Sequence, residues 1–136
     1  MSPEFESVFV RLRSILEKHA GDFAVGKDVK DSYALEGHVG PATLRAWGGK
    51  MRKPRIPVAW VGVGKAYVSF HLMPLYGNAK LAGGLSKALK ARMQGKSCFN
   101  FTTLDEALLG ELEEVTRRGL TAFKKAGFVA RPVAKR

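Results

Sequence analysis

The residues best suited to chemistry lie between positions 65 and 101, in the segment KAYVSFHLMPLYGNAKLAGGLSKALKARMQGKSCFNF. The first part of the segment alternates like a β-strand, so Tyr67, Ser69 and His71 are expected on the face opposite the apolar residues. Such a polar and aromatic face favours a pocket for a small anionic or polar ligand. The alternative is structural: Asn78 only caps a helix and Tyr76 only fills a turn. The candidate ligand-binding residues are Tyr67, Ser69, His71, Tyr76, Asn78, Lys96, Cys98 and Asn100.

Cys98 is the single cysteine of the chain, which rules out an intrachain disulfide. Its thiol and the imidazole of His71 meet across the sheet if their strands are neighbours, and the nearby Lys96 favours a reactive thiolate. The more conservative interpretation is a buried thiol beside a hydrogen-bonded histidine, which is the commoner case. The histidines and Cys98 lack the sequence spacing of metal ligands, so we predict no metal site.

Catalytic templates are absent from the sequence. It contains no GxSxG nucleophile elbow, no Walker phosphate loop and no GxGxxG motif after a strand. Paired carboxylates are not expected either, because every Asp and Glu lies in the flanks of the chain. Whether the protein is an enzyme stays open on these grounds, and a binding role is favoured over catalysis.

The positive charge of the chain is concentrated in its middle. Between Gly37 and Leu104 there are eleven Lys and Arg residues and no Asp or Glu, whereas the flanks hold twelve residues of each sign. The net charge of +11 therefore resides in this segment, which favours nucleic acid, phosphorylated metabolites or anionic membranes as partners. The alternative is that the lysines serve solubility. The candidate anion or nucleic-acid patch comprises Arg45, Trp47, Lys50, Arg52, Lys53, Arg55, Lys87, Lys90 and Arg92.

The loop-rich stretch Gly37–Arg55 contains the sequence RAWGGKMRKPR, in which basic residues surround Trp47. Basic side chains beside an aromatic ring suit bound phosphates with a stacked base. A solvated hairpin tip with its tryptophan packed on the body is the alternative. A short strand over Thr43–Trp47 fits the pattern, and whether this loop covers the polar sheet face stays open.

Hydrophobic periodicity indicates which elements position the candidate residues. Apolar residues three and four apart over Ser2–His19 predict an amphipathic helix capped by Ser2. Residues 22–30 are polar and predict a connector before a first strand at Lys30–Glu36. A capping box, in which Thr103 caps and Glu106 reaches back, predicts the start of the last helix. The other predicted elements are a hairpin of 57–63 and 66–72, a short helix after Asn78, a helix from Ser86 to Met93 stopped by Gly95, and an edge-like strand at Ser97–Phe101.

Length and composition fit one domain. The chain has 136 residues, of which 46% are hydrophobic, which suits a single domain over residues 1–130 followed by a basic tail at 131–136. No signal-peptide pattern is present, so a cytoplasmic location is expected, and no apolar run is long enough to cross a membrane. We predict an α+β fold: a curved antiparallel sheet of about four to five strands, with the N- and C-terminal helices packed on one face. Whether the protein is a monomer or a dimer stays open.

Two blocks of the sequence resemble a known family. The stretch Tyr67–Tyr76 and the block GKSCFNF at 95–101, followed by an acidic, leucine-rich helix, resemble the YdhG-like family of domains of unknown function. The resemblance covers roughly Trp60–Phe123 and is most specific in GKSCFNF. It implies an α+β domain whose terminal helices pack on a curved antiparallel sheet. Some relatives are labelled frataxin-like iron chaperones, but hard iron ions prefer oxygen ligands and the acids here are confined to the flanks, so no residue is assigned to iron.

The sequence therefore favours a small binding domain for an anionic or polar ligand or a phosphate-bearing partner, with its cofactor, if any, unknown. Iron handling, which only the resemblance implies, is one alternative. Nucleic-acid binding through the basic middle region is another.

Overall fold

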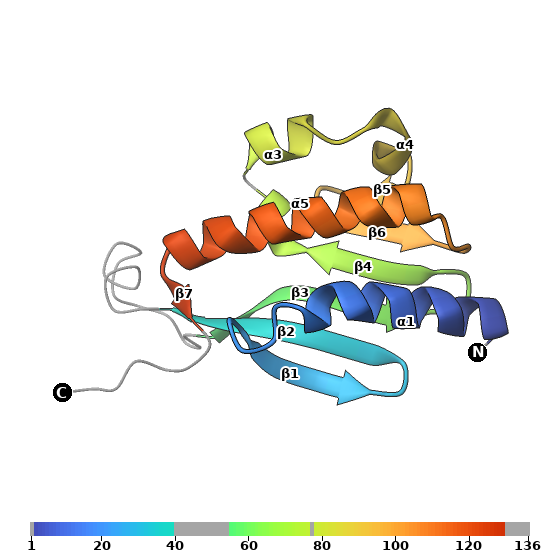
Figure 1. The fold of residues 1–136 in the computed structure, drawn as a ribbon, viewed down its shortest axis with the longest axis horizontal. Helices are drawn as coiled ribbons and strands as arrows, with labels where there is room; N and C mark the ends of the chain where they lie inside the picture. The colour runs from blue at the N-terminus through green and yellow to red at the C-terminus, as the bar shows by residue number, and fades with distance from the viewer. Residues whose placement is uncertain (1, 40–54, 77, 130–136) are drawn as a thin grey trace.

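A seven-stranded antiparallel sheet carries two long helices on one face in the computed structural model, which describes residues 2–39, 55–76 and 78–129 (Figure 1). The helices are α1 (Pro3–Glu17) and α5 (Glu106–Lys125). The predicted α+β class, with the N- and C-terminal helices on an antiparallel sheet, is confirmed. The strands lie in the order β1 (Ala24–Val29), β2 (Ser32–Val39), β3 (Arg55–Val63), β4 (Val68–Leu72), β6 (Cys98–Phe101) and β5 (Met93–Gln94), and β7 (Phe128–Val129) pairs with β2 off this path.

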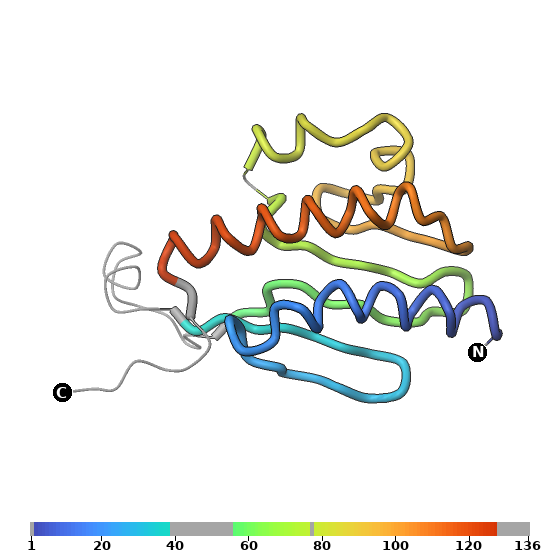
Figure 2. The backbone as a smooth tube through the Cα atoms, viewed as in Figure 1, coloured from blue at the N-terminus to red at the C-terminus, as the bar shows by residue number. Residues whose placement is uncertain are grey.

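Figure 2 shows how the chain runs through this sheet. The strands β1 to β4 are consecutive antiparallel neighbours. The chain then leaves the sheet through a 3-10 turn (Met73–Leu75), α3 (Ala79–Gly83) and α4 (Lys87–Lys90). It returns as β5 and β6, and β6 pairs with β4. This return places the GKSCFNF block directly beside the polar strand predicted at 66–72.

The first helix forms as its sequence predicts. The Ser2 hydroxyl accepts a hydrogen bond from the backbone N–H of Phe5 at 3.1 Å, and Pro3 occupies the first helical position. The apolar stripe of the helix is buried against the sheet through Val8, Phe9, Leu12, Ile15 and Leu16. Full burial of one such side chain contributes roughly 1.5–3 kcal/mol.

The two faces of the sheet differ because side chains alternate along each strand. In β4, Val68, Phe70 and Leu72 are buried beneath the helices, whereas Ser69 and His71 are half-buried on the opposite face. In β6, Phe99 is likewise buried on the helix side. The faces predicted for these two strands are therefore confirmed. The sheet face opposite α1 and α5 is called the outer face from here on.

The strand count is higher than predicted. The predicted connector at 22–30 is wrong, because Ala24–Val29 forms β1 and pairs with β2. Only Ala24 of this strand is partly buried, so no apolar alternation marks the strand in the sequence, and the ladder hydrogen bonds to β2 hold it. The strands β5 and β7 have two residues each, which is too short for a periodic signal.

The segment between α3 and β6 also departs from the prediction. Ser86 caps α4 as expected, its hydroxyl accepting from the N–H of Leu89 at 3.1 Å, but the helix ends at Lys90 and not at Met93. Met93 belongs to β5 and pairs with Phe99. Gly95 does not stop a helix: it adopts a φ of 79° between β5 and β6, a conformation that favours glycine. Because β5 covers β6, the strand predicted as edge-like is not at the edge.

The cap of α5 differs from the predicted capping box. Asp105 caps the helix, its Oδ1 atom accepting from the N–H of Leu108 at 3.3 Å, so the role predicted for Thr103 is wrong. Aspartate serves this position as well as threonine does. The apolar residues predicted to face inward are confirmed for Leu108, Leu109, Leu112, Val115 and Leu120, which are buried, while Phe123 is partly buried.

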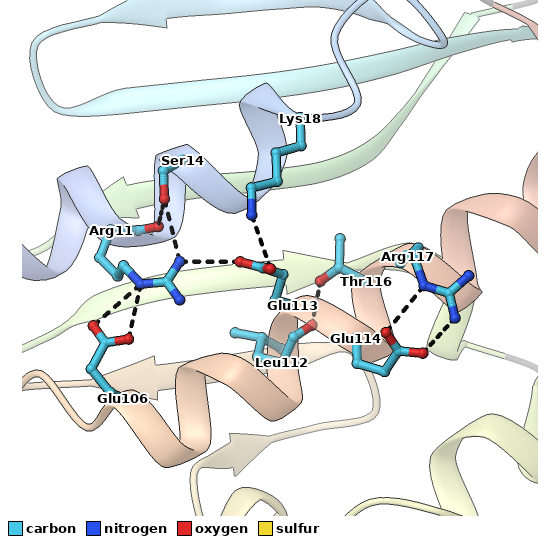
Figure 3. A network of polar contacts seen from close by, with 9 residues as sticks. All are labelled: Arg11, Ser14, Lys18, Glu106, Leu112, Glu113, Glu114, Thr116 and Arg117. Carbon is cyan, nitrogen blue, oxygen red and sulfur yellow. Dashed lines mark hydrogen bonds and ion pairs between the residues drawn. The ribbon is translucent and has the colours of Figure 1, made fainter.

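Ion pairs join the two helices above the sheet (Figure 3). The guanidinium of Arg11 contacts Glu106 at 3.2 Å and Glu113 at 3.3 Å, and the Lys18 ammonium lies 2.9 Å from Glu113. Elsewhere in the flanks, Arg13 pairs with Glu17, Lys124 with Asp22, and Arg117 with Glu114. Five of the twelve acidic residues of the chain thus pair with flanking bases within the described residues: Glu17, Asp22, Glu106, Glu113 and Glu114.

None of the helices in the described ranges is long and apolar enough to cross a membrane. The strand predicted at Thr43–Trp47 and the basic tail predicted at 131–136 fall outside the described residues.

Candidate functional site

The polar candidates of β4 and β6 come together on the outer face, where Ser69, His71, Cys98 and Asn100 form the outer-face group. The register pairs Ser69 with Asn100 and His71 with Cys98. The predicted meeting of the His71 imidazole and the Cys98 thiol is confirmed, with 3.8 Å between Nε2 and Sγ. This juxtaposition exists because the chain returns from α4 to pair β6 with β4.

A hydrogen-bonded network fixes these side chains. The hydroxyl of Ser69 donates to Oδ1 of Asn100 at 2.9 Å, and the Cys98 thiol donates to the same oxygen at 3.6 Å. The Asn100 amide in turn donates from Nδ2 to Oε1 of Gln94 on β5 at 2.9 Å. The amide orientation of Asn100 is therefore set by its neighbours, and one of its two N–H donors is left for a ligand.

The electrostatics of the His71–Cys98 pair indicate two neutral groups. Burial lowers the pKa of the His71 imidazole. Burial also raises the pKa of the Cys98 thiol, and the hydroxyl of Ser69 opposes that rise to a smaller extent. Both shifts favour uncharged forms at neutral pH, so the pair is a thiol beside a neutral imidazole rather than a thiolate–imidazolium ion pair. That arrangement suits hydrogen bonding more than nucleophilic attack.

Trp60 joins this site although the sequence prediction did not include it. Its indole stacks on the His71 ring with 4.6 Å between centroids and 14° between planes, because β3 and β4 place the two residues directly opposite each other. Alternation within 57–63 would have predicted that Trp60 lies on the other face of the sheet from Val61. It would not have predicted that Trp60 pairs with His71 on the neighbouring strand. That register depends on the length of the turn from Gly64 to Tyr67. Gln94 carried no signal, because it directly follows Met93, which was predicted as the end of a helix and not as part of a strand.

Tyr76 and Lys96 lie together at the end of β4. The Lys96 ammonium is 5.8 Å from the centroid of the Tyr76 ring, a cation–π contact, and Tyr76 is 63% exposed. A backbone hydrogen bond joins the segments that carry Tyr76 and Lys96: the N–H of Leu72 donates to the carbonyl of Ser97 at 2.8 Å. Tyr67, at 36% exposure, lies just before the other end of β4. The strand thus has an aromatic residue near each end.

Asn78 does not join the outer-face group. Its Oδ1 atom accepts from the N–H of Leu81 at 3.0 Å, so it caps α3, as the structural alternative held. The side chain also lines a hollow of about 310 Å³ together with Lys80, Leu81 and Arg118 of α5, on the helix side of the molecule. A single pocket that contains both Asn78 and His71 is therefore not formed by the described residues.

The predicted basic patch is only partly described. Lys87 and Lys90 of α4 are exposed, as is Arg92 just before β5, and no carboxylate of the described residues pairs with them. Glu111 approaches this segment but accepts from the N–H of Ser86 at 2.7 Å. Arg55 begins β3, and its backbone lies opposite His38. The remaining members of the patch lie outside the described residues: Arg45, Trp47, Lys50, Arg52 and Lys53.

Two other hollows lie away from the outer-face group. One of about 590 Å³ is lined by residues that include Phe5, Asp31 and Lys65, and one of about 560 Å³ lies beside Arg11 and Leu104. Neither they nor the hollow at Asn78 is lined by Ser69, His71 or Asn100. A ligand on the outer-face group would therefore contact a different surface from these hollows.

Comparisons with protein-family models, with curated proteins and with solved structures found no match to this chain.

Proposed function

We propose that this protein is a binding domain that holds a small anionic, phosphate-bearing ligand on the outer face of its sheet, and that it is not an enzyme. The phosphate would lie near Lys96, between the end of β6 and the aromatic ring of Tyr76. The polar side chains of β4, β5 and β6 would orient the rest of the ligand. Phosphate-bearing partners and free phosphorylated molecules share this chemistry.

The observation that carries the proposal is the absence of carboxylates from this half of the sheet. Residues 55–101 contain no Asp or Glu, and they supply all of β3, β4, β5 and β6. Lys65, Arg92 and Lys96 lie exposed at the ends of these strands. An anion on this surface meets cations and neutral donors without repulsion from a nearby acid, and such one-sign fields attract anionic ligands.

Hydrogen-bond donors on the outer face support the same ligand class. The Lys96 ammonium, the second N–H of Asn100 and the amide of Gln94 are available to phosphate oxygens. The neutral imidazole of His71 adds one N–H donor, whose position on the ring depends on the tautomer. Hydrogen bonds from the charged Lys96 ammonium to phosphate oxygens are charge-assisted and therefore stronger than hydrogen bonds between neutral groups.

The test is a titration of the ¹⁵N-labelled protein with inorganic pyrophosphate, followed through the backbone amide resonances. We expect shifts to concentrate at residues 93–101. The variant Lys96→Glu should weaken binding by about tenfold or more, because it replaces a charge-assisted contact with repulsion. Lys80→Glu is the matched control: it makes the same charge change within the acid-free segment, but beside Arg118 and away from the outer face.

Equal weakening by the two variants would assign binding to net charge alone and overturn the proposed site. Unchanged resonances at 93–101 at millimolar pyrophosphate would overturn the proposed function itself. Both variants change exposed residues, so folding is not expected to limit the comparison.

Membership of the YdhG-like family is part of this proposal. It is supported by the GKSCFNF block and by the antiparallel sheet with terminal helices that the resemblance implied. Iron handling receives no support from the described residues, in which no three His, Cys, Asp or Glu side chains gather.

A further inference from the structure

Arg92 is the residue at which the chain passes from α4 into β5. Its backbone N–H still donates to the carbonyl of Leu89 at 3.0 Å, in the last turn of the helix, while its own carbonyl accepts from the N–H of Asn100 on β6 at 2.8 Å. The pairing of β5 with β6 therefore continues by one residue before Met93 and brings Arg92 opposite Asn100. A cationic residue thus shares a row of the sheet with a member of the outer-face group.

The alternation of side chains assigns Arg92 to the outer face. Met93 pairs with Phe99, which is buried on the helix side, and Met93 itself packs against the core. Gln94 lies on the other face, since its Oε1 atom accepts from the Asn100 amide. Side chains two residues apart in an extended strand share a face, so Arg92 is on the same face as Gln94. Arg92 is exposed and pairs with no carboxylate of the described residues.

Arg92 and Lys96 approach the outer face from different sides. The Lys96 ammonium lies over the Tyr76 ring, 5.8 Å from its centroid, and so beyond the end of β4. Arg92 adjoins β5, which is two places from β4 in the sheet. Neighbouring strands are about 4.8 Å apart, so a group bound over β5 and a group bound beside Tyr76 are roughly 10 Å apart. A phosphate at Lys96 therefore leaves Arg92 as a second position for an anion.

Neutral hydrogen-bond donors lie between the two cations. The side-chain oxygen of Gln94 is occupied by Asn100, which leaves the Gln94 amide N–H groups and the second N–H of Asn100 for a ligand. Residues 55–101 contain no Asp or Glu, so an anion at either end meets no acid from β3 to β6. The middle of this surface suits hydroxyl or ether oxygens, whereas its two ends suit negative charge.

We propose that Arg92 is a second anion-binding residue of the outer face, and that the ligand carries two phosphate groups joined by a polar linker. This proposal rests on the proposed function, whose phosphate at Lys96 is the first of the two. Arginine suits the second position because its guanidinium donates two parallel hydrogen bonds to one phosphate. The two phosphates belong to a bisphosphorylated small molecule or to a nucleic-acid strand, which share this chemistry.

The test compares fructose 1,6-bisphosphate with fructose 6-phosphate, which lacks one of the two phosphates. Titration of the ¹⁵N-labelled full-length protein, followed through the amide resonances, measures both affinities. We expect the bisphosphate to bind about tenfold more tightly, the gain from one additional charge-assisted contact. Arg92→Gln should remove this gain. It should weaken bisphosphate binding about tenfold and leave fructose 6-phosphate within about twofold of the parent protein.

Lys90→Gln is the matched control. It removes the same charge from an exposed side chain of the acid-free segment, but Lys90 belongs to α4 and not to the β5–β6 pair, so both affinities should stay within about twofold. Arg92→Lys is a second variant, which keeps the charge and loses the two parallel donors. Its affinity for the bisphosphate should lie between those of the parent and of Arg92→Gln.

Two results would overturn the second position and leave the proposed function intact. One is equal weakening of bisphosphate binding by Arg92→Gln and Lys90→Gln, which would assign the effect to net charge. The other is weakening of both sugar phosphates by Arg92→Gln in the same proportion, since Arg92 would then share the phosphate at Lys96. Unchanged resonances with pyrophosphate and with both sugar phosphates would instead overturn the proposed function and the second position together.

A single-stranded oligothymidylate identifies the source of the two phosphates. Binding that is tighter than that of the bisphosphate, is weakened by Arg92→Gln and falls steeply with salt would support the second position, with a nucleic-acid strand as the source. Tighter binding of the bisphosphate, again weakened by Arg92→Gln, would support it with a small molecule as the source.

Discussion

The thiol of Cys98 lies 3.8 Å from Nε2 of His71 on neighbouring strands, and burial keeps both groups neutral. A reactive cysteine needs a positive neighbour that stabilises the thiolate. The neutral imidazole does not supply that charge, and the same thiol donates to the Asn100 amide oxygen. The pair therefore has the residue types of a nucleophilic dyad without its electrostatics.

Alkylation of Cys98 by iodoacetamide should consequently be slower in the native protein than in the unfolded chain at neutral pH. The raised pKa of the thiol leaves a smaller thiolate fraction, and the thiolate is the form that reacts. The ratio of the two rates should approach one as the pH rises above the native pKa. His71→Asn should change the native rate little, because no imidazolium is lost. Mass spectrometry of timed samples measures these rates, and a native rate at or above the unfolded one would indicate an ion pair.

Glu113 should stabilise the protein in a pH-dependent way. Its pKa is lowered first by the hydrogen bond from Lys18 and further by the contact with Arg11. A depressed folded pKa means that the stabilisation is complete above the unfolded value, near 4.5, and is lost as the pH falls through the folded pKa. Glu113→Gln should thus cost about 0.5–1 kcal/mol at pH 7 and nothing at low pH. Urea unfolding across pH measures the difference.

High salt should reduce the cost of Glu113→Gln, because the ion pairs that join α1 and α5 are partly solvated. Glu114→Gln is the control. Its carboxylate pairs with Arg117 inside α5, so salt should change the cost of this substitution less than it changes the cost of Glu113→Gln. A cost for Glu113→Gln that is constant from neutral to acidic pH would contradict the ion-pair explanation.

The start of α5 offers a direct comparison between the predicted and the observed cap. Asp105→Ala should destabilise the protein by about 1 kcal/mol, because the N–H of Leu108 loses its acceptor. Thr103→Ala should change stability by less than about 0.5 kcal/mol, since Thr103 is exposed and outside the helix. Urea unfolding of both variants at pH 7 measures the pair. A larger loss for Thr103→Ala would restore the capping box.

Local periodicity predicted the faces of β4 and β6 correctly, because alternation is a property of each strand alone. Hence Ser69, His71, Cys98 and Asn100 were predicted on one surface. The Trp60–His71 stack was not predictable in this way, because register depends on turn length and on which strands become neighbours. Nor was β1, since a strand exposed on most of its residues has no apolar pattern to detect.

The helix signals were ambiguous in a different way. Thr103 and Asp105 are both good caps within three residues of each other, and the choice between them depends on where α5 docks on the sheet. Asn78 was a candidate for both a ligand pocket and a helix cap, and it forms the cap. Tertiary packing decides which residue caps a helix in such cases, because the alternative local conformations differ little in free energy.

Gly119 marks the closest approach of α5 to the turn that follows β4. A Cβ atom at this position would lie 2.9 Å from Cβ of Pro74 and 3.5 Å from Cδ2 of Leu81. Gly119→Ala would gain about 1 kcal/mol of helix propensity. It would lose about 1–3 kcal/mol to overpacking, because the proline ring is rigid and buried. We therefore expect a net destabilisation of about 1 kcal/mol, measured by urea unfolding.

Gly110 provides the matched control on the same helix. It is exposed and has no atom within 4 Å of an added Cβ, so Gly110→Ala should stabilise the protein by about 1 kcal/mol. The two alanine variants should thus move stability in opposite directions. In the double variant Gly119→Ala with Pro74→Gly, which removes the Cβ atom of Pro74, the overpacking cost should disappear, giving a coupling energy of about 2 kcal/mol between the two sites. If Gly119→Ala stabilises the protein as much as Gly110→Ala does, the turn after β4 moves to accommodate the added methyl group. The close packing of α5 on Pro74 would then not constrain the end of β4 beside the outer-face group.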